Sequence, residues 1–223
     1  MIHGKYINQG EELTDVLKVR QLSLCDAIEN ISGEADELDG LAVNILVDLP
    51  LEDAGAADAA GGTGVTGVGV GASTDGPVNK ALETAKINEY GKQVLCMGCG
   101  RILCDIDRFR FYIDQVGILP GLRNHGFGEF ALRMLVDKAN LCGAQKVWLK
   151  LPEQWASEEA KERALKFFTG MHFKFEAYEE DAEGQDGQAA QTGLSEQSAG
   201  DASANEGRWM AADIDDFHSC CHH

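Results

Sequence analysis

The sequence is short of cationic side chains, proline and aromatic residues. Its 223 residues include only 4 Pro and 7% aromatics, and 19 Lys and Arg stand against 37 Asp and Glu, for a formal net charge of −18. Proteins that bind nucleic acid through the phosphate backbone, or anionic membranes through a basic patch, need clustered cations. We therefore expect neither nucleic acid nor a membrane as a partner.

Long apolar runs are also missing. No run approaches the roughly 18 residues that a membrane span needs, and residues 1–13 lack the apolar stretch of a secretory signal. We accordingly expect a cytoplasmic protein. Its seven cysteines are expected to be mostly free thiols in a reducing compartment.

Two segments of low complexity interrupt the chain. Residues 52–77 are rich in Gly and Ala, and residues 176–206 hold nine acidic side chains and no Lys or Arg. After the first few residues of the acidic segment, neither has the apolar surface that offsets the entropy of ordering. We expect one domain over 1–214, with insertions at about 52–77 and 179–206, followed by a Cys/His-rich tail at 215–223.

Hydrophobic patterning predicts a mixed α/β fold. Strands are expected at 1–8, 41–49, 93–104, 108–119, 145–151, 172–178 and 207–214. Helices are expected at 11–25, 78–89, 126–142 and 157–168, the last with Ser157 as its N-cap.

The most informative segment runs from Asp114 to Ala139. It reads as a strand, a turn at Pro120, the pattern Arg123-x-x-Gly126-x-Gly128, and an amphipathic helix. The first N–H groups of a helix lack intrahelical partners, and the helix dipole adds positive charge there. Glycines let an anion approach the backbone closely. The segment therefore predicts a phosphate-binding turn, in which Arg123 would add a charged contact.

This segment resembles the GNAT superfamily of acyl-CoA-dependent N-acetyltransferases. The family's signature is (Gln/Arg)-x-x-Gly-x-(Gly/Ala) after a strand of the type found here as Val116-Gly117-Ile118-Leu119-Pro120. The resemblance implies a central, mostly antiparallel mixed sheet flanked by helices, with strands splayed at the CoA site. It also implies acetyl-CoA as co-substrate and acetyl transfer to a primary amine of a small molecule or peptide by direct attack. Dimers are common in the family, so a homodimer is one expectation.

The resemblance also implies roles for individual residues. Backbone groups of Val116 and Ile118 would pair with pantetheine, and the Val116 N–H would stabilise the thioester oxyanion. The predicted cofactor-binding residues are Val116, Gly117, Ile118, Arg123, Asn124, His125, Gly126, Phe127 and Gly128. Asp114 and Tyr112, expected to alternate onto the face of Val116, are the candidate bases for the amine proton.

The sequence departs from the family pattern in one segment. Where the family often has a Tyr that protonates the leaving thiolate, this chain has Phe168, and His172 takes the place of a usual Gly. Either another group or water supplies that proton, or activity is weak or absent. The alternative function is a catalytically silent, CoA-binding or regulatory protein of the same fold.

Three further patterns offer other interpretations. Residues 62–67 match the dinucleotide pattern G-x-G-x-x-G, but they lie within a Gly-rich repeat and are interpreted as loop. Cys96 and Cys99 have metal or redox spacing, yet positions i and i+3 of a strand face opposite sides, so core thiols are expected. The terminal run 218–223 holds three His and two Cys; adventitious metal binding is the favoured interpretation and a metal-responsive protein the alternative.

Overall fold

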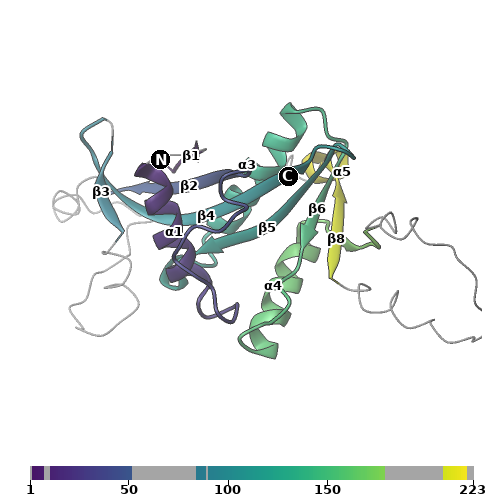
Figure 1. Cartoon of the computed structure of the whole chain (residues 1–223). Helices are drawn as coiled ribbons and strands as arrows, with labels where there is room; N and C mark the ends of the chain where they lie inside the picture. The colour runs from purple at the N-terminus through teal and green to yellow at the C-terminus, as the bar shows by residue number, and fades with distance from the viewer. Residues whose placement is uncertain (1, 8–10, 52–83, 89, 179–207, 220–223) are drawn as a thin grey trace, which may run out of the picture.

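An open sheet of eight strands forms the centre of the molecule (Figure 1). The computed structural model describes residues 2–7, 11–51, 84–88, 90–178 and 208–219. The strands are β1 (His3–Ile7), β2 (Val43–Pro50), β3 (Ala85–Ile87), β4 (Gln93–Asp105), β5 (Arg110–Ile118), β6 (Lys146–Lys150), β7 (Lys174–Phe175) and β8 (Trp209–Asp213). The sheet order is β1-β2-β4-β5-β6-β8-β7, and β3 pairs with β4 beside this path.

Strand direction follows the expected mixed pattern. The strand pairs are antiparallel, except that β5 and β6 run parallel. A parallel pair needs a long crossover connection, which α3 supplies here. The predicted fold class, a mixed and mostly antiparallel sheet flanked by helices, is confirmed.

Helices cover both faces of the sheet. They are α1 (Glu11–Leu24), the 3-10 turn η2 (Pro120–Leu122), α3 (Phe127–Leu141), α4 (Glu158–Gly170) and α5 (Ile214–Ser219). α1 lies against β2, β4 and β5 on one face, and α3 packs against the same strands on the other. Among the described residues, no helix is both long and apolar enough to span a bilayer.

The apolar stripes explain these positions. In α3 the predicted apolar face is buried through Ala139, with Leu132, Leu135 and Ala139 all 0% exposed, and it forms the main core with the sheet residues that point the same way. Cys142, predicted at the end of this face, is exposed, because it lies just beyond the last turn of the helix. A smaller cluster around Val16 and Val19 of α1 packs on the opposite face. The Oγ atom of Ser157 accepts a hydrogen bond from the Ala160 N–H, which confirms the predicted N-cap of α4.

The structure differs from the sequence expectations at one predicted helix and at the end of the last strand. The helix expected at 78–89 is wrong where the structure describes it, because Ala85–Ile87 forms β3, an edge strand paired with β4. Tertiary pairing overrides the weak helical pattern of so short a segment. After β8 the chain continues as α5, whose Phe217 is 2% exposed and belongs to the main core.

Two β-bulges change which side chains share a face. The first bulge is in β4, where it pairs with β2. Two residues of β4, Met97 and Gly98, lie opposite the single residue Val47 of β2. The second bulge is in β5, where it pairs with β4. Ile113 lies opposite Ile102 and Gln115 opposite Arg101, so Asp114 is the extra residue between them. A bulge reverses the alternation of side chains beyond it.

Candidate functional site

Strands β5 and β6 lie side by side over a short stretch only. Their parallel pairing joins Phe111–Ile113 to Val147–Leu149 and stops there. From Asp114 to Ile118, β5 still pairs with β4 on one edge, while the described residues place no strand on the other edge. The end of β5 therefore presents a free strand edge inside the sheet.

The backbone groups of Val116 and Ile118 point toward this free edge. Leu119 N–H donates to Met97 O at 2.9 Å, so Leu119 faces β4. Because N–H and C=O groups of an antiparallel strand alternate between its two neighbours, Gly117 also faces β4, whereas Val116 and Ile118 face away from it. The Ile118 C=O accepts from Arg123 Nε at 3.0 Å on that side. The free edge thus offers the Val116 N–H and C=O.

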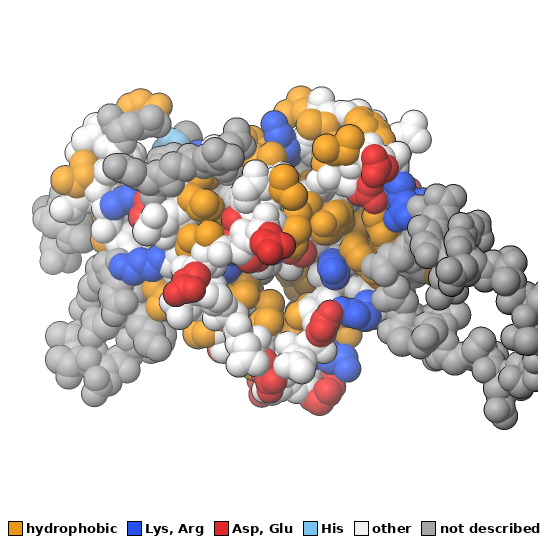
Figure 2. Space-filling model, viewed as in Figure 1, with side chains coloured by type: hydrophobic (Ala, Val, Ile, Leu, Met, Phe, Trp, Pro, Cys, Tyr) orange, Lys and Arg blue, Asp and Glu red, His pale blue; other side chains and the backbone are white. Residues whose placement is uncertain are grey.

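A small open cleft lies beside this edge. Its walls come from the end of α1, from β5, from β6 with the loop after it, and from α4. Most of the lining side chains are apolar, among them Val116, Trp155 and Phe168. Figure 2 shows the surface hollowed between β5 and α4, with hydrophobic side chains around the hollow.

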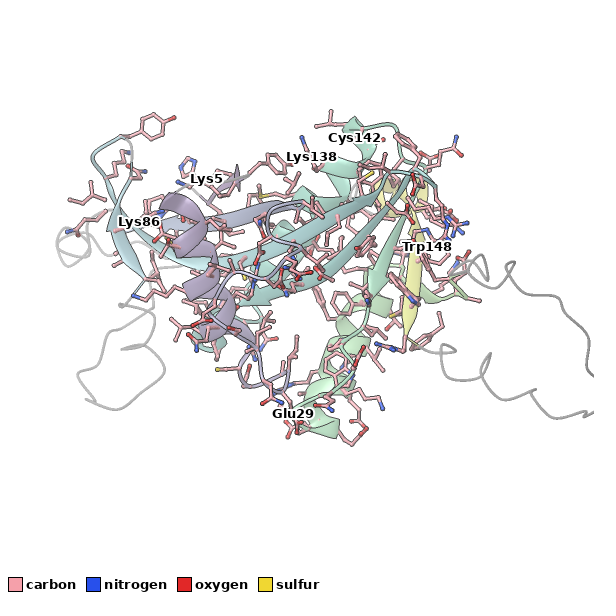
Figure 3. All side chains as sticks on the ribbon, in the orientation of Figure 1. Lys5, Glu29, Lys86, Lys138, Cys142 and Trp148 are labelled. Carbon is pink, nitrogen blue, oxygen red and sulfur yellow. The ribbon has the colours of Figure 1, made fainter. Side chains whose placement is uncertain are left out.

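A strap crosses the cleft; we use this name for residues 26–30, the loop that follows α1. Ala156 N–H donates to Ala27 O at 3.0 Å, and Glu29 N–H donates to Gln154 O at 3.3 Å. Ile28 forms an isolated β-bridge with Trp155. Figure 3 labels Glu29 at this crossing, beside the lower end of α4. The strap joins the two sides of the sheet where β5 and β6 separate.

The predicted phosphate-binding turn lies directly beyond the free edge. Gly126 is the N-cap of α3 and has φ of +80°, and Asn124 has φ of +65°. No side chain caps this helix, so the backbone N–H groups of its first turn keep their capacity for an external anion. Alternating left-handed residues also form the kind of concave N–H array that binds anions.

Arg123 of this turn is already engaged. Its guanidinium donates to both Asp26 oxygens at 2.6 and 2.7 Å, to Ser23 O at 2.6 Å and to Ile118 O at 3.0 Å. Hydrogen bonds from Arg123 hold the pKa of Asp26 below its ordinary value. Arg123 therefore clamps the end of α1 to the end of β5. A phosphate contact from Arg123 stays a prediction, and it would require some of these bonds to be exchanged.

The bulge at Asp114 corrects the expected arrangement of the candidate bases. Val116 packs with Ile113 and Ile118 on the α3 side of the sheet. Tyr112 lies on the other face, where its ring meets Trp209 edge-on at 5.7 Å. The expectation that Tyr112 and Asp114 share the face of Val116 is therefore wrong, because the bulge turns the later side chains over.

A buried ionic network surrounds Asp114. Arg101, 2% exposed, donates to both Asp114 oxygens at 2.9 and 2.6 Å, to both Asp36 oxygens at 2.6 and 2.8 Å, and to Asp39 at 3.0 Å. Arg20 binds the two oxygens of Asp39 from α1. Two cations thus serve three carboxylates, and the segment after α1 is held to the sheet. Sequence reasoning did not identify this network, because its members are far apart in the chain.

Several pKa values follow from these surroundings. Burial opposes ionisation of Asp39, but hydrogen bonds from Arg20 and from the Asp36 N–H outweigh it and lower the Asp39 pKa. Burial also opposes the charge of Arg101, yet hydrogen bonds from that side chain to Asp114 and Asp36 raise its pKa. For Tyr112, burial and then the Asp114 charge raise the pKa, so its phenol is neutral at pH 7.

Gln115 was missed by sequence reasoning. It lies next to the bulge and lines the cleft. Its Oε1 atom is buried and has no hydrogen-bond partner among the described residues. A buried acceptor without a partner is rare in folded proteins. A lone Gln in a strand gives no signal in the sequence, and only the cleft around it makes it notable.

The remaining predicted residues are placed as follows. Gly117 faces α1 closely, since a Cβ there would lie 2.3 Å from Ser23 Oγ. Phe168 is 9% exposed and lines the cleft. The aromatic rings of His125 and Phe127 lie 5.9 Å apart at the start of α3. A Cβ at Gly128 would reach Phe167 at an ordinary 3.4 Å.

The cysteine pair does not lie as expected. Cys96 and Cys99 both point to the α1 face, because the bulge at Met97 reverses the alternation between them. The expectation of opposite faces is wrong, although both thiols are buried as predicted. Burial raises the pKa of Cys96 to about 12 and of Cys99 to about 11, so both are protonated and poor nucleophiles.

Two sequence patterns fall outside the described residues. These are the Gly-rich run at 62–67 and the end of the His/Cys tail at 220–223. Within the described ranges, no group of three or more His, Cys, Asp or Glu side chains is arranged to hold a metal ion.

A comparison with protein families finds a match in the part of the chain that contains this site. Residues 80–173 match the profile of the acetyltransferase (GNAT) family. This range runs from the segment before β3 to just past the end of α4, and it contains the free edge, the cleft-lining end of β6 and the predicted phosphate-binding turn. The family match thus falls on the segment that contains the Arg123 motif, and it confirms the resemblance inferred from that motif. Acetyl-CoA is the co-substrate of that family. No curated protein matches the sequence.

The chain is also similar to solved structures, each at a TM-score below 0.5. A GNAT-family acetyltransferase from Staphylococcus aureus Mu50 has 10% identity and a TM-score of 0.45, with 95% of this chain and 99% of that chain covered. One from Streptococcus pneumoniae TIGR4 has 16% identity and a TM-score of 0.43, over 78% and 89%. N-acetylglutamate synthase from Neisseria gonorrhoeae, complexed with coenzyme A and N-acetyl-glutamate, has 10% identity and a TM-score of 0.47, over 96% and 35%.

Proposed function

We propose that this protein is an N-acetyltransferase that transfers the acetyl group of acetyl-CoA to a primary amine of a small molecule or peptide. The observation that carries the proposal is the free edge of β5 beside the N-terminus of α3. The free edge offers backbone groups to an amide-bearing chain, and the N-terminus of α3 offers N–H groups to a phosphate. The family match over residues 80–173 supports the same co-substrate.

The residues that would hold acetyl-CoA fit its chemical parts. The Asn124–Gly128 turn supplies backbone donors for the diphosphate, with glycine at the position of φ +80°. Val116 supplies a backbone C=O for pantetheine, and the apolar walls of the cleft exclude water along it. Bound acetyl-CoA would supply a thioester, whose acetyl carbon is the electrophile for an amine.

The chain's own groups would then assist in two ways. The Val116 N–H is a fixed donor at the free edge and would bind a developing oxyanion there. Asp114 lines the cleft and is 12% exposed at its side chain, and we propose that it receives the amine proton through water. The neutral phenol of Tyr112 does not act as a base at pH 7. Since Phe168 cannot donate a proton, water would protonate the leaving thiolate.

A second function is favoured by one observation. Phe168, buried in the cleft wall, stands where the family often has a proton-donating Tyr. A catalytically silent protein that binds CoA as a regulator would keep the turn and the free edge but lose transfer. The two functions differ in turnover and share cofactor binding.

The first experiment is calorimetric titration of acetyl-CoA, with NAD as a comparison. Gly126→Glu places a carboxylate in the turn and should weaken acetyl-CoA binding by about tenfold or more. Gly143→Glu is the matched control, because Gly143 has φ of +88°, lies just beyond the other end of α3, and has equally open space around its Cα. Equal affinity of the two variants would refute the turn as the diphosphate site.

Turnover is then measured with a panel of primary amines: n-butylamine, phenethylamine, spermidine and Nα-acetyl-lysine methylamide. Release of CoA that depends on the amine supports the transferase. Micromolar acetyl-CoA binding with no turnover of any amine favours the silent protein. Tighter binding of NAD than of acetyl-CoA would refute both.

A further inference from the structure

The guanidinium of Arg123 has no edge left for a phosphate. A guanidinium binds an oxyanion best through two parallel N–H donors on one edge. On one edge, Nη1 and Nη2 of Arg123 donate to the two oxygens of Asp26 at 2.6 and 2.7 Å. On the other edge, Nε donates to Ile118 O at 3.0 Å and Nη2 donates to Ser23 O at 2.6 Å. A diphosphate can therefore bind an edge of Arg123 only by replacing one of these partners.

The partners of Arg123 differ in how easily they are replaced. Ser23 is 0% exposed, and its C=O would lose a charged donor at a buried position, which costs free energy. The Asp26 side chain is 38% exposed, so its carboxylate can return to water, and exposed ion pairs contribute little to stability. Asp26 is therefore the partner that an incoming anion replaces, because one anion takes the place of another on the same edge.

Arg123 lies close to the first turn of α3, where the N–H groups for the diphosphate are found. Its Nε atom is 3.0 Å from Ile118 O, and a Cβ at Gly128, in that first turn, would lie 3.9 Å from Ile118 Cγ1. The guanidinium and the start of α3 thus adjoin the same residue of β5. The Arg123 side chain is 28% exposed, so an anion can reach it from solvent.

Asp26 is also the first residue of the strap that crosses the cleft. The other part of the strap is held by the hydrogen bonds from Ala156 N–H to Ala27 O and from Glu29 N–H to Gln154 O. Its first residue is held by the two hydrogen bonds from Arg123. Transfer of this edge of Arg123 from Asp26 to a phosphate therefore frees one end of the strap.

We propose that Asp26 is a positioning residue that competes with the diphosphate of acetyl-CoA for Arg123, and that this exchange releases the start of the strap. The inference rests on the proposed function and names the residue that sets cofactor affinity within it. Without cofactor, the Asp26 carboxylate occupies the Nη1–Nη2 edge of Arg123. With cofactor bound, the diphosphate occupies that edge and Asp26 faces water.

A double-mutant cycle tests whether Asp26 acts through Arg123. Acetyl-CoA is titrated by calorimetry into wild type, Asp26→Asn, Arg123→Met and the double variant. We expect Asp26→Asn to tighten binding about threefold to tenfold when Arg123 is present, because the competing anion is gone. In the Arg123→Met background the same change should have no effect beyond about 1.5-fold, since no cation is left to compete for.

Two further variants serve as controls for charge. Asp26→Glu keeps a carboxylate for Arg123 and should bind acetyl-CoA as wild type does. Asp15→Asn removes the same charge in the first half of α1, where the Asp15 side chain is 37% exposed and pairs with Lys86 of β3. Its acetyl-CoA affinity should equal that of wild type.

Two measurements separate competition from a general loosening of the site. S-acetyl-pantetheine carries the thioester without the diphosphate, so wild type and Asp26→Asn should bind it equally. Hydrogen exchange of the Glu29 and Ala156 amides reports on the strap in the absence of any ligand. Asp26→Asn should speed this exchange about threefold or more, and Asp15→Asn should leave it unchanged.

The contrary outcomes can be told apart. If acetyl-CoA binds wild type but Asp26→Asn does not tighten it, or tightens it equally beside Arg123→Met, the competition is overturned and the transferase stands. An equal gain in affinity for S-acetyl-pantetheine overturns it too, because that ligand has no diphosphate. Unchanged exchange of the two amides overturns the release of the strap. If neither wild type nor any variant binds acetyl-CoA, the proposed function itself fails.

Discussion

The sheet has two parts that are stabilised differently. The first part, β1, β2, β4 and β5, has helices on both faces and a buried ionic network around Arg101. The second part, β6, β8 and β7, carries an aromatic layer on the same face as α1, beyond the strands that α1 covers. There Tyr178 stacks on Trp209 at 4.1 Å, and Arg110 lies 5.3 Å from the Tyr178 ring centroid. Figure 3 labels Trp148 of this layer on β6.

The difference explains where the cleft forms. The ionic contacts of Arg101 join β4, β5 and the segment after α1, and none of them reaches β6. Packing of aromatic side chains stabilises the second part. Backbone pairing between them covers only Phe111–Ile113 with Val147–Leu149 among the described residues. The Tyr112 ring also meets Trp209 across the two parts, and the strap crosses the cleft.

One continuous core on the α3 face also joins the two parts, since it contains Ile113 and Ile118 of β5 together with Val147 and Leu149 of β6. The free edge of β5 is therefore stable without a neighbouring strand, because β4 and this core hold β5 in place.

The largest expected effect breaks the ionic support of the first part. Arg101→Met leaves Asp36, Asp39 and Asp114 without their shared cation, and removing one partner of a buried ion pair costs about 3–5 kcal/mol. Arg163→Met is the control, since its pair with Glu159 is 3.6 Å long and exposed; it should cost under about 1 kcal/mol. Urea denaturation measures both, and equal losses would refute the assigned role of the network.

The next effect acts on the free edge itself. Val116→Pro removes an N–H that points away from β4, so the pairing with β4 stays while the proposed oxyanion donor is lost. Loss of such a donor lowers kcat by about 10²–10³-fold. Val116→Ala keeps the N–H and should stay within about tenfold of wild type. Steady-state kinetics with the best amine measure kcat for both variants. Equal kcat values would exclude the Val116 N–H as the oxyanion donor.

A smaller effect depends on pH. The folded pKa of Asp39 is lowered, so this carboxylate contributes stability that is present above its unfolded pKa of about 3.9. That contribution is lost as the pH falls below about 4 toward the folded pKa. The difference in unfolding free energy between wild type and Asp39→Asn should therefore shrink with acidification over that window. A difference that stays constant from pH 6 to pH 2 would contradict the lowered pKa.

The smallest expected effect lies in the second part. His172 follows α4 and has φ of +66°, a left-handed conformation that costs a non-glycine residue about 1 kcal/mol. His172→Gly should therefore raise the unfolding free energy by up to about 1 kcal/mol. Acetyl-CoA affinity should not change, because the residue lies outside the cleft lining. Thermal unfolding and calorimetry together test this, and a fall in melting temperature would show that the histidine side chain outweighs the strain.

Local patterns predicted much of the fold. The apolar stripe of α3, the N-cap at Ser157 and the alternation in β6 depend on neighbours a few residues away, so periodicity detects them. The phosphate-binding turn is equally local, since Arg123, Gly126 and Gly128 lie within six residues. The short β3 was missed because a three-residue edge strand has no pattern of its own.

Other features depended on long-range contacts. The bulges at Met97 and Asp114 arise from pairing with β2 and β4, and they decide which face each later side chain occupies. Strict alternation therefore misplaced Tyr112 and the cysteine pair. The Arg123 clamp on Asp26 spans 97 residues, and no spacing rule connects those two positions.

By itself, the sequence determined most of the elements, their order and the turn before α3, because hydrophobic periodicity and backbone capping act over short distances. The tertiary structure alone decided that β5 ends with a free edge, that Arg101 binds both oxygens of Asp114, and that the Gln115 Oε1 atom is buried without a partner among the described residues. The physical reason is that register, bulges and buried charge are set by the free energy of contacts between segments far apart in the chain, and no single segment carries that information.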